Sequence, residues 1–517
     1  MSKYVLGVDV GTTAIKAALF DEKSREVESA TVEYTLLTPQ AGYVELEAST
    51  YLDTFKRATA ACLTSDAASS AEIEVLGLSC QGETMLCLDE NGNPLRTVIV
   101  WMDNRAVAES EEIEAHFGRD HIHKVTGQVA MDPIWPAAKI LWIKRNEPEV
   151  FERTAKFVLL KDYLVERMTG QLSSEDSLLC STILWDINTR EYWDEMLDYL
   201  GISKSQLPDI ARQGEIVGRV TAEGARRFNL PLGLPVSVGA LDQACGALGL
   251  GNATPGIFSE STGSALTTVT VVNELKLDEA GRVPCFASAL PGKYMLHTFS
   301  TGGMVMRWFR DEFCATEKQI EELCGINAYY LIDEEVRQVP AGSDGLIVIP
   351  HLQGSGPPDL DTYARGIFFG LTLSHKKQHL SRGIMEGVAM VLRRMIEATV
   401  ALDVEIKEIV SLSGGAKSAA WCQIKSDITQ LPLRTVASAG SAACRGAAII
   451  AGGAAGLWDD LAALSRQDIE FEHSYEPQID LAETYDRHFD RFNKLQQAVT
   501  PLLREIGAPV DTELSIA

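Results

Sequence analysis

The residues from Asp9 to Lys16 have the types and the spacing of a phosphate-binding turn. Gly11 lets backbone N–H groups approach an anion closely, and the hydroxyls of Thr12 and Thr13 can donate hydrogen bonds to phosphate oxygens. Lys16 adds positive charge, whereas the carboxylate of Asp9 repels phosphates unless a hard cation lies between them. The pattern predicts a nucleotide site with Mg²⁺ at Asp9. A hairpin with a solvated turn is the alternative, because these residue types also favour turns for backbone reasons.

A second candidate for chemistry is Asp242, which follows the apolar run 235–241 and precedes a series of small residues. An acid at the carboxyl end of a strand is well placed to contact a ligand. An N-cap of the following helix explains the same position equally well.

Polar residues also follow two further predicted strands, at residues 75–79 and 98–101. The carboxyl ends of central strands are where α/β sheets bind ligands. The polar residues at these two ends are Gln81, Glu83, Trp101, Asp103 and Arg105. Two alternatives stay open: an ordinary loop at residues 81–83, and an intrahelical pair of Asp103 and Arg105 that caps the next helix.

The opening pattern of strand, polar turn and strand recurs at residues 257–269, with Thr262, Gly263 and Ser264 in the turn. A strand, a glycine turn and a helix N-terminus at residues 409–418 give another geometry that suits anions. The two hairpins predict two similar domains that face each other over one nucleotide. Because the stretch at residues 250–256 is rich in Gly, we expect domains at residues 1–252 and 253–517.

Hydrophobic periodicity predicts the elements that position these residues. A hairpin is expected at residues 4–20, and further strands at residues 26–34, 85–88 (paired with 98–101) and 345–350. Helices are expected at residues 49–63 with Ser49 as the N-cap, 106–117, 136–142 and 380–402. Residues 157–170 read as a strand that leads into a helix ended by Gly170, and residues after about 470 as a polar helical segment.

The composition limits the class of protein. A chain of 517 residues is longer than chains that fold around a single hydrophobic core, which suggests two domains. The net charge of −26 argues against nucleic acid or an anionic membrane as the main partner, but not against a nucleotide. Ten scattered cysteines without a Cys-x-x-Cys pair indicate reduced core thiols of a cytoplasmic protein. The sequence contains no Gly-x-x-x-x-Gly-Lys-Ser/Thr loop and no His-Glu-x-x-His motif. We expect no signal peptide and no membrane-spanning helix.

Taken together and in this order, these stretches resemble the FGGY family of carbohydrate kinases over nearly the whole chain. The similar segments are Asp9-x-Gly11-Thr12-Thr13-x-x-Lys16, Trp101-x-Asp103-x-Arg105, Pro136-x-x-Lys139-Ile140-x-Trp142, Thr262-Gly263-Ser264, Gly366-x-Phe368-x-Gly370-Leu371 with His379-Leu380 and Glu386, and Gly414-Gly415-Ala416-Lys417-Ser418 with Trp421. The resemblance implies an α/β fold of two ribonuclease H-like, actin-like ATPase domains with a cleft between them.

The resemblance also implies a reaction, in which ATP phosphorylates a sugar or polyol hydroxyl and Asp242 is the catalytic base. Asp9 would hold Mg²⁺ through water. The implied substrate-binding residues are Gln81, Gly82, Glu83, Trp101, Asp103, Asp242 and Gln243. The implied nucleotide-binding residues are Gly11, Thr12, Thr13, Lys16, Thr262, Gly263, Gly303, Arg307, Gly414, Gly415, Ala416 and Lys417.

Departures from the family pattern bear on the substrate. Glycerol kinases carry Gln-Arg-Glu-Thr and xylulose kinases Gln-Met-His-Gly where this chain has Gln81-Gly82-Glu83-Thr84. Because the carboxylate of Glu83 repels acid groups, we expect a neutral ketose or polyol, with a pentulose such as xylulose first. A glycerol- or erythritol-type polyol kinase is the alternative. An ATPase like actin or the heat-shock chaperones and a non-catalytic sugar sensor are rivals, and a homodimer is possible.

Overall fold

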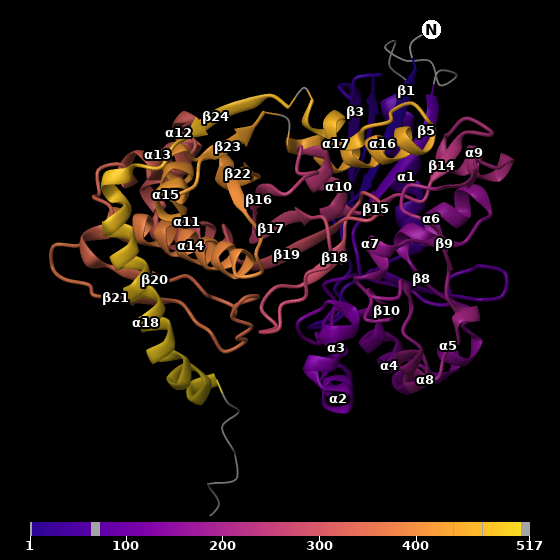
Figure 1. The fold of residues 1–517 in the computed structure, drawn as a ribbon, viewed down its shortest axis with the longest axis horizontal. Helices are drawn as coiled ribbons and strands as arrows, with labels where there is room; N and C mark the ends of the chain where they lie inside the picture. The colour runs from indigo at the N-terminus through magenta and orange to yellow at the C-terminus, as the bar shows by residue number, and fades with distance from the viewer. Residues whose placement is uncertain (1–2, 64–72, 438, 468, 508–517) are drawn as a thin grey trace, which may run out of the picture. The chain divides into compact units, whose positions relative to one another are not determined.

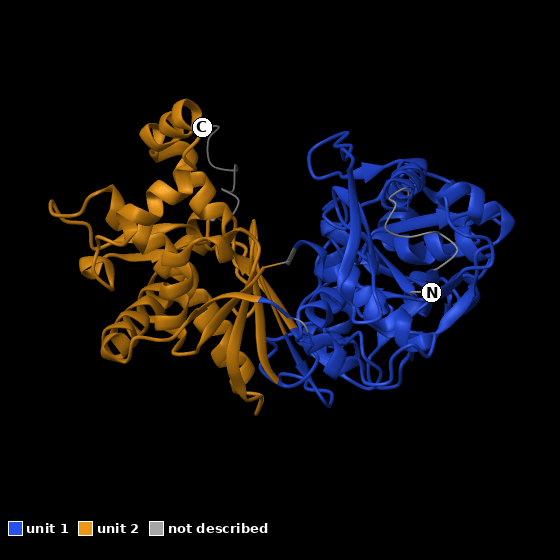
Figure 2. Ribbon diagram, turned by 90° about the horizontal axis from the view of Figure 1, so that it is seen from above, with its two compact units in different colours: residues 1–255, 270–296, 438–470 blue, residues 256–269, 297–437, 471–517 orange. Residues whose placement is uncertain are grey.

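The computed structural model of the protein describes residues 3–63, 73–437, 439–467 and 469–507. Contacts divide the chain into two compact units, which Figure 2 draws in different colours. The first unit contains residues 1–255, 270–296 and 438–470, and the second contains residues 256–269, 297–437 and 471–517. Each unit is thus assembled from three segments of the chain, and the domains expected at residues 1–252 and 253–517 stay a prediction.

The first unit is built on a mixed sheet of strand order β13-β14-β5-β1-β2-β3, with β15 beside β5. β1 (Tyr4–Val10) runs antiparallel to β2 (Ala14–Phe20) and parallel to β5 (Ile73–Cys80), so the hairpin predicted at residues 4–20 is confirmed. The other strands are β3 (Glu26–Glu33), β13 (Ile216–Arg219), β14 (Pro235–Ser237) and β15 (Ala240–Leu241).

Smaller sheets and helices complete this unit (Figure 1). A four-stranded sheet contains β4 (Glu45–Leu46), β7 (Val98–Ile99), β6 (Met85–Leu88) and β8 (Lys156–Leu159). The short strands are β9 (Ser173–Ser174), β10 (Trp185–Asp186), β11 (Glu191–Tyr192), β12 (Asp209–Ile210) and β18 (Cys285–Ala287). The helices are α1 (Ala48–Leu63), α2 (Val107–Phe117), α3 (Arg119–Thr126), α4 (Pro136–Asn146), α5 (Pro148–Arg153), α6 (Leu160–Thr169), α7 (Asp176–Leu179), α8 (Asp194–Leu200), α9 (Ala222–Phe228), α10 (Asp242–Gly249), α16 (Ala442–Ala454) and α17 (Leu461–Arg466).

A second seven-stranded sheet has the order β18-β19-β17-β16-β22-β23-β24. Its strands include β16 (Gly256–Thr262), β17 (Ala265–Val272), β19 (Tyr294–Thr301), β22 (Ile406–Leu412), β23 (Leu433–Val436) and β24 (Phe471–Tyr475). A separate hairpin pairs β20 (Ile347–Ile349) with β21 (Ile367–Phe369). The helices of the second unit are α11 (Met304–Phe313), α12 (Ala315–Cys324), α13 (Ala328–Val336), α14 (Lys377–Val400), α15 (Ala419–Thr429) and α18 (Ala482–Gly507).

The two sheets repeat one arrangement of strands. β1 runs antiparallel to β2 and parallel to β5, just as β16 runs antiparallel to β17 and parallel to β22. Beyond these, β5 and β22 each have a parallel neighbour, β14 or β23, which pairs antiparallel with an edge strand, β13 or β24. The repeated hairpin found in the sequence therefore belongs to a repeated sheet.

Helix α16 packs unusually closely against the first sheet and against α10 (Figure 1). A Cβ added to Gly7 of β1 would lie 2.0 Å from the carbonyl oxygen of Cys444, and one added to Gly77 of β5 would lie 2.1 Å from that of Ala447. Since real Cβ atoms do not approach this closely, glycine is required where α16 crosses β1 and β5. The sheet that carries Asp9 is thereby fixed to the segment 442–454.

Most elements expected from the sequence are present, with bounds shifted by a few residues, and Gly170 ends α6 in the left-handed conformation. Three details were wrong. α1 begins at Ala48, so Ser49 lies inside its first turn and is not the N-cap. Leu241 is the N-cap of α10, and Asp242 is its first residue. The segment after residue 470 forms the strand β24 before the helix α18.

The cysteines and helices agree with the expectations from composition. All ten cysteines are free thiols, and only Cys324 is exposed, as expected for core thiols without a disulfide framework. Among the described residues, none of the helices combines the length and the hydrophobicity needed to cross a lipid bilayer.

Candidate active site

The turn between β1 and β2 is held in place by its backbone carbonyls. The N–H of Gly11 donates to the Ala14 carbonyl at 3.0 Å and closes the turn. The Gly11 carbonyl accepts hydrogen bonds from the Tyr34 hydroxyl and, at 3.4 Å, from Nε2 of Gln81. The N–H groups of Thr12 and Thr13 have no acceptor within the part of the chain that the structure describes. They are free to donate to an anion, as the sequence pattern predicts.

Asp9 lies at the end of β1, directly before this turn. The Ser79 hydroxyl on β5 donates to its Oδ1 at 2.7 Å. Burial raises the pKa of Asp9 to about 6, although the hydrogen bond from Ser79 and the charge of Lys16 lower it. The ammonium of Lys16 donates instead to the Gly440 carbonyl at 3.1 Å and to the Ser441 hydroxyl. Asp9 is therefore a half-buried acid that forms no ion pair within 4.0 Å among the described residues, although the charge of Lys16 acts on it.

Asp242 lies beside this acid. It follows β15, which pairs with β5, and β5 in turn pairs with β1, so the strands that lead to the two acids are separated by β5 alone. Its Oδ1 accepts a hydrogen bond from the N–H of Gln243 at 2.6 Å. Burial, and then the negative charge of Asp9, raise the pKa of Asp242 to about 7. The structure thus brings together the two acids that the sequence singled out, and Gln243 follows them half-buried at the start of α10.

The loop 81–84 after β5 adds another carboxylate, and we call it the acceptor loop. Glu83 has a φ of +48°, which is uncommon for a residue other than glycine. Burial raises the pKa of Glu83, and the charges of Asp242 and Asp132 raise it further, whereas Lys139 lowers it. A Cβ on Gly82 would lie 2.9 Å from the Ser181 hydroxyl, so a side chain there would require the Ser181 side chain to shift.

Two residues near the acceptor loop, Asp132 and Lys139, were not predicted as site residues from the sequence. Asp132, before α4, accepts a hydrogen bond from the N–H of Ile134 at 3.1 Å, and burial raises its pKa. Lys139 on α4 is buried, and its ammonium donates to the carbonyls of Glu83 at 3.3 Å, Val100 at 3.1 Å and Trp101 at 3.1 Å. An ammonium has three hydrogens, so Lys139 fixes these loops and keeps none for a ligand.

The three predicted residues after β7 differ in their surroundings. The indole Nε1 of Trp101 donates to the Thr12 hydroxyl at 2.9 Å, which places Trp101 beside the phosphate turn. Asp103 is fully buried and accepts hydrogen bonds from the Val44 N–H at 2.6 Å and from Arg105. The Arg105 guanidinium also pairs with Glu45 at 2.6 Å. The structure therefore brings Trp101 into the site but surrounds Asp103 with structural partners.

In the second unit, the predicted nucleotide residues gather around the turn after β16. The N–H of Gly303 donates to the Gly263 carbonyl at 2.8 Å, and a Cβ on Gly415 would lie 2.6 Å from the Cβ of Thr262. Gly414, Ala416 and Lys417 belong to the same short turn as Gly415, and Arg307 lies in the first turns of α11 with an exposed side chain.

Beneath the Thr262 turn lies a buried ion pair. The Lys425 ammonium lies 2.7 Å from Oε1 of Glu260, and both side chains are fully buried. Glu260 also accepts hydrogen bonds from the hydroxyls of Thr262, at 2.7 Å, and Ser411. Unlike Asp9, this acid has a close cation of its own.

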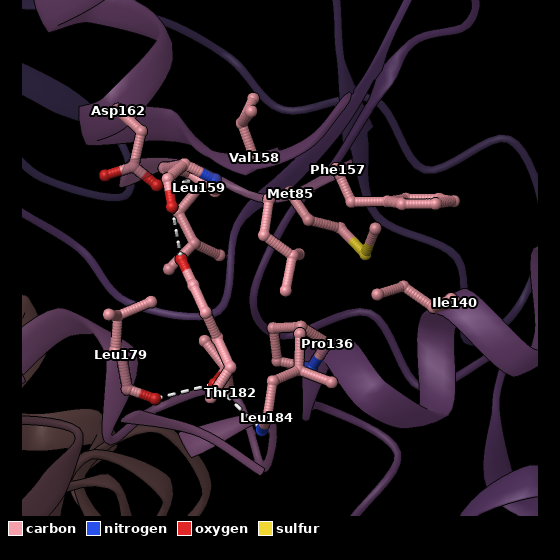
Figure 3. Close-up of a pocket in the computed structure, with 13 residues that line it drawn as sticks. Met85, Pro136, Ile140, Phe157, Val158, Leu159, Asp162, Leu179, Thr182 and Leu184 are labelled. Carbon is pink, nitrogen blue, oxygen red and sulfur yellow. Dashed lines mark hydrogen bonds between the residues drawn. The ribbon is translucent and has the colours of Figure 1, made fainter. Parts of the chain in front are cut away.

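A small cavity in the first unit has a different character (Figure 3). It has a volume of about 20 Å³, which suits roughly one water molecule. Its lining is mostly apolar and includes Met85, Ile140, Leu159, Thr182 and Leu184, with Asp162 among the residues drawn. Its size excludes a sugar, so it is not the acceptor site.

The chain matches both domains that define one family. The N-terminal domain of the FGGY family of carbohydrate kinases matches residues 4–249, and the C-terminal domain of this family matches residues 261–455. The chain belongs to the FGGY family of carbohydrate kinases. The resemblance seen in the sequence and the two-domain FGGY kinase fold are thereby confirmed, and the protein is a phosphotransferase of a family whose kinases use ATP.

Individual relatives differ in substrate. The chain is 29% identical to the gluconokinase of Bacillus subtilis (strain 168) over 466 residues, with 90% of each chain covered. It is 28% identical to the xylulose kinase of the same organism, with 95% of this chain and 96% of the relative covered. The structure of a ligand-bound xylulose kinase from Lactobacillus acidophilus is similar, with a TM-score of 0.90, 25% identity, and coverage of 98% of this chain and 100% of the other.

Proposed function

We propose that this kinase transfers the γ-phosphoryl group of ATP to a hydroxyl of a neutral ketose or polyol, with a pentulose such as xylulose as the first candidate. The observation that carries the proposal is the charge around the acceptor loop. The carboxyl groups of Glu83, Asp132 and Asp242 interact electrostatically there, and the nearby ammonium of Lys139 donates all its hydrogens to backbone carbonyls. Carboxyl groups form hydrogen bonds with sugar hydroxyls, whereas they offer an acid group no cation and repel it when they are ionised.

In this proposal Asp242 accepts the proton of the attacking hydroxyl. Its raised pKa suits a general base, since proton acceptors work best when their pKa lies near the working pH. The N–H groups and hydroxyls of Thr12 and Thr13 donate to oxygens of the transferring group, which stabilises the charge that develops there. The residues around Thr262 and Gly415 in the second unit bind the nucleotide, and the protein lies in the cytoplasm.

Mg²⁺ fits the residues present at Asp9. Asp9 is half-buried, its Oδ1 accepts one hydrogen bond, and it forms no ion pair among the described residues. Within the described ranges there is no group of three or more acidic, His or Cys side chains that could hold a metal, so most ligands would be phosphate oxygens and water. When bound, the ion would neutralise charge on the phosphates.

Two related substrates are less consistent with the acceptor loop. Gluconate carries a carboxylate, for which the acids around Glu83 offer no cation and which they repel when ionised. Glycerol kinases place an arginine at the position of Gly82, so this chain lacks that guanidinium, and a side chain there would require the Ser181 and Leu241 side chains, 2.9 and 3.0 Å from an added Cβ, to shift. Another neutral polyol, such as erythritol, stays the alternative.

The test is ADP production from ATP and Mg²⁺ with a panel of pentuloses, hexuloses, polyols and sugar acids. We expect the highest kcat/KM with a neutral ketose or polyol and little ADP without an acceptor. Preferred turnover of gluconate would overturn the substrate class. ADP release that is the same with and without every acceptor would favour an ATPase and overturn the proposal as a whole.

A further inference from the structure

The indole of Trp101 makes a hydrogen bond whose direction is fixed by chemistry. Its Nε1 lies 2.9 Å from the Thr12 hydroxyl oxygen. An indole N–H can only donate, so the oxygen of Thr12 is the acceptor in this contact. The hydroxyl hydrogen of Thr12 then remains, and no acceptor for it is present in the part of the chain that the structure describes. Trp101 thus leaves Thr12 oriented as a donor at the phosphate turn.

The backbone of Trp101 is tied to the acceptor loop. Its N–H donates to the Thr84 hydroxyl at 3.0 Å, and its carbonyl accepts from the Lys139 ammonium at 3.1 Å. The same ammonium holds the Glu83 carbonyl at 3.3 Å. A continuous series of hydrogen bonds therefore leads from Glu83 through Trp101 to Thr12, entirely within the first unit.

We propose that Trp101 is a positioning residue for phosphoryl transfer. It holds the Thr12 hydroxyl as a hydrogen-bond donor to the transferring group and joins the phosphate turn to the acceptor loop. The inference rests on the proposed function, because it assigns Thr12 a role in the same reaction. It goes further in separating the N–H of Trp101, which acts through Thr12, from the aromatic ring, which stays available to contact the acceptor.

The test is a double-mutant cycle with Trp101→Phe and Thr12→Val. Trp101→Phe removes the indole N–H and keeps an aromatic ring, and Thr12→Val removes the hydroxyl with little change in shape. We expect Trp101→Phe to lower kcat by about three- to tenfold, and Thr12→Val by about tenfold or more. If Trp101 acts through Thr12, adding Trp101→Phe to Thr12→Val changes kcat by less than about twofold. Multiplicative losses, or a Trp101→Phe effect confined to the KM of the acceptor, would overturn the inference.

Controls separate this role from a structural one. Trp193→Phe removes another indole hydrogen bond of the first unit, to Glu195 at 3.3 Å, and should leave kcat unchanged. Thr84→Val removes the hydroxyl that accepts a hydrogen bond from the Trp101 N–H, and so loosens the position of the same indole. This variant replaces Trp101→Phe if that variant does not fold. It should lower kcat in the wild-type background only. A Thr84→Val loss of the same size in the Thr12→Val background would contradict the coupling.

The cycle is measured with whichever acceptor the wild-type protein phosphorylates, so an error in the proposed substrate does not affect it. If no acceptor is phosphorylated, the proposed function fails. The coupling is then measured in acceptor-independent ATP hydrolysis, where additive losses would overturn the role of Trp101 and non-additive losses would support it.

Discussion

Asp9 and Glu260 occupy the same place in two sheets of repeated strand order. Asp9 lies on β1 opposite Ser79 of the parallel strand β5, and Glu260 lies on β16 opposite Ser411 of the parallel strand β22. Each acid accepts a hydrogen bond from the serine that it faces. Glu260 is also paired with the buried ammonium of Lys425 at 2.7 Å, whereas Asp9 has no such partner in the described residues. One acid is thus neutralised within its unit, and the other is left available to a ligand.

The Glu260–Lys425 pair predicts a stability effect. Lys425→Met leaves a buried carboxylate without its cation, which typically lowers the free energy of unfolding by about 3–5 kcal/mol. Thermal unfolding of the variant should show a lower Tm for the second unit. The double variant Glu260→Gln/Lys425→Met should regain part of the loss, and a single variant as stable as the wild type would show that the pair is unimportant.

Two glycines of α10 predict opposite effects of the same substitution. A Cβ at Gly249 would lie 1.8 Å from the carbonyl oxygen of Ala442, so Gly249→Ala forces α16 away and should destabilise the protein by about 1–3 kcal/mol. A Cβ at Gly246 meets no atom within 4 Å, so Gly246→Ala should be neutral or slightly stabilising, because Ala favours a helix. Chemical denaturation of both variants tests this contrast. Equal stabilities would contradict the close packing of α10 on α16.

The buried acids predict that stability rises as the pH falls from 8 towards 5. Burial raises the pKa of Asp9 to about 6 and of Asp242 to about 7, from an ordinary value of 3.8. Between these values the folded state binds more protons than the unfolded state, so protonation favours folding. Without ligands, Tm should increase over this range, and Asp242→Asn should reduce the increase and raise Tm at pH 8. A Tm of Asp242→Asn below that of the wild type at pH 8 would contradict the burial penalty.

The same pKa predicts the direction of the activity profile. A general base must be ionised, so kcat/KM should fall below about pH 7 in the free enzyme. Initial rates of ADP production at a fixed, low acceptor concentration from pH 5.5 to 9 measure this. A flat profile through pH 7 would show that no group with this pKa is needed.

The carboxyl groups near the acceptor loop predict a change in specificity. Glu83→Gln combined with Asp132→Asn removes two carboxyl groups that an acid substrate would face. At pH 9, above the pKa of about 8 to which burial raises Glu83, the double variant should raise kcat/KM for gluconate relative to the neutral substrate by about tenfold, or ~1.4 kcal/mol. Glu195→Gln, at an exposed position of the same unit, is the matched control and should leave the ratio unchanged. An unchanged ratio in the double variant would separate these acids from substrate selection.

Local patterns made part of this arrangement predictable. The hairpin at Asp9 and its repeat near Thr262 are contiguous segments with alternating apolar strands, so the sequence alone predicts them. Asp132 and Lys139 were missed as site residues because only the fold brings α4 against the acceptor loop. Glu260 and Lys425 are 165 residues apart, which leaves no local signal of their pairing.

Asp103 shows that a local pattern does not predict the partners of a side chain. Its position after a strand suggested a ligand contact, but burial against Val44 and Arg105 depends on contacts that the sequence does not reveal. A polar residue at the end of a strand predicts where a side chain lies along the chain. It does not predict which groups form hydrogen bonds or ion pairs with that side chain in the folded protein.

The most direct test of the account is the turnover of Asp242→Asn with saturating ATP and acceptor. Loss of the base should lower kcat by about 10²–10⁴-fold while the Kd for ATP changes little. Asp162→Asn is the control, because burial raises the pKa of this acid in the same unit to about 7 as well, yet Asp162 accepts a hydrogen bond from the Leu159 N–H at the start of α6 and lines the small cavity of Figure 3. We expect Asp162→Asn to retain wild-type kcat. Wild-type turnover by Asp242→Asn would contradict its role as the base.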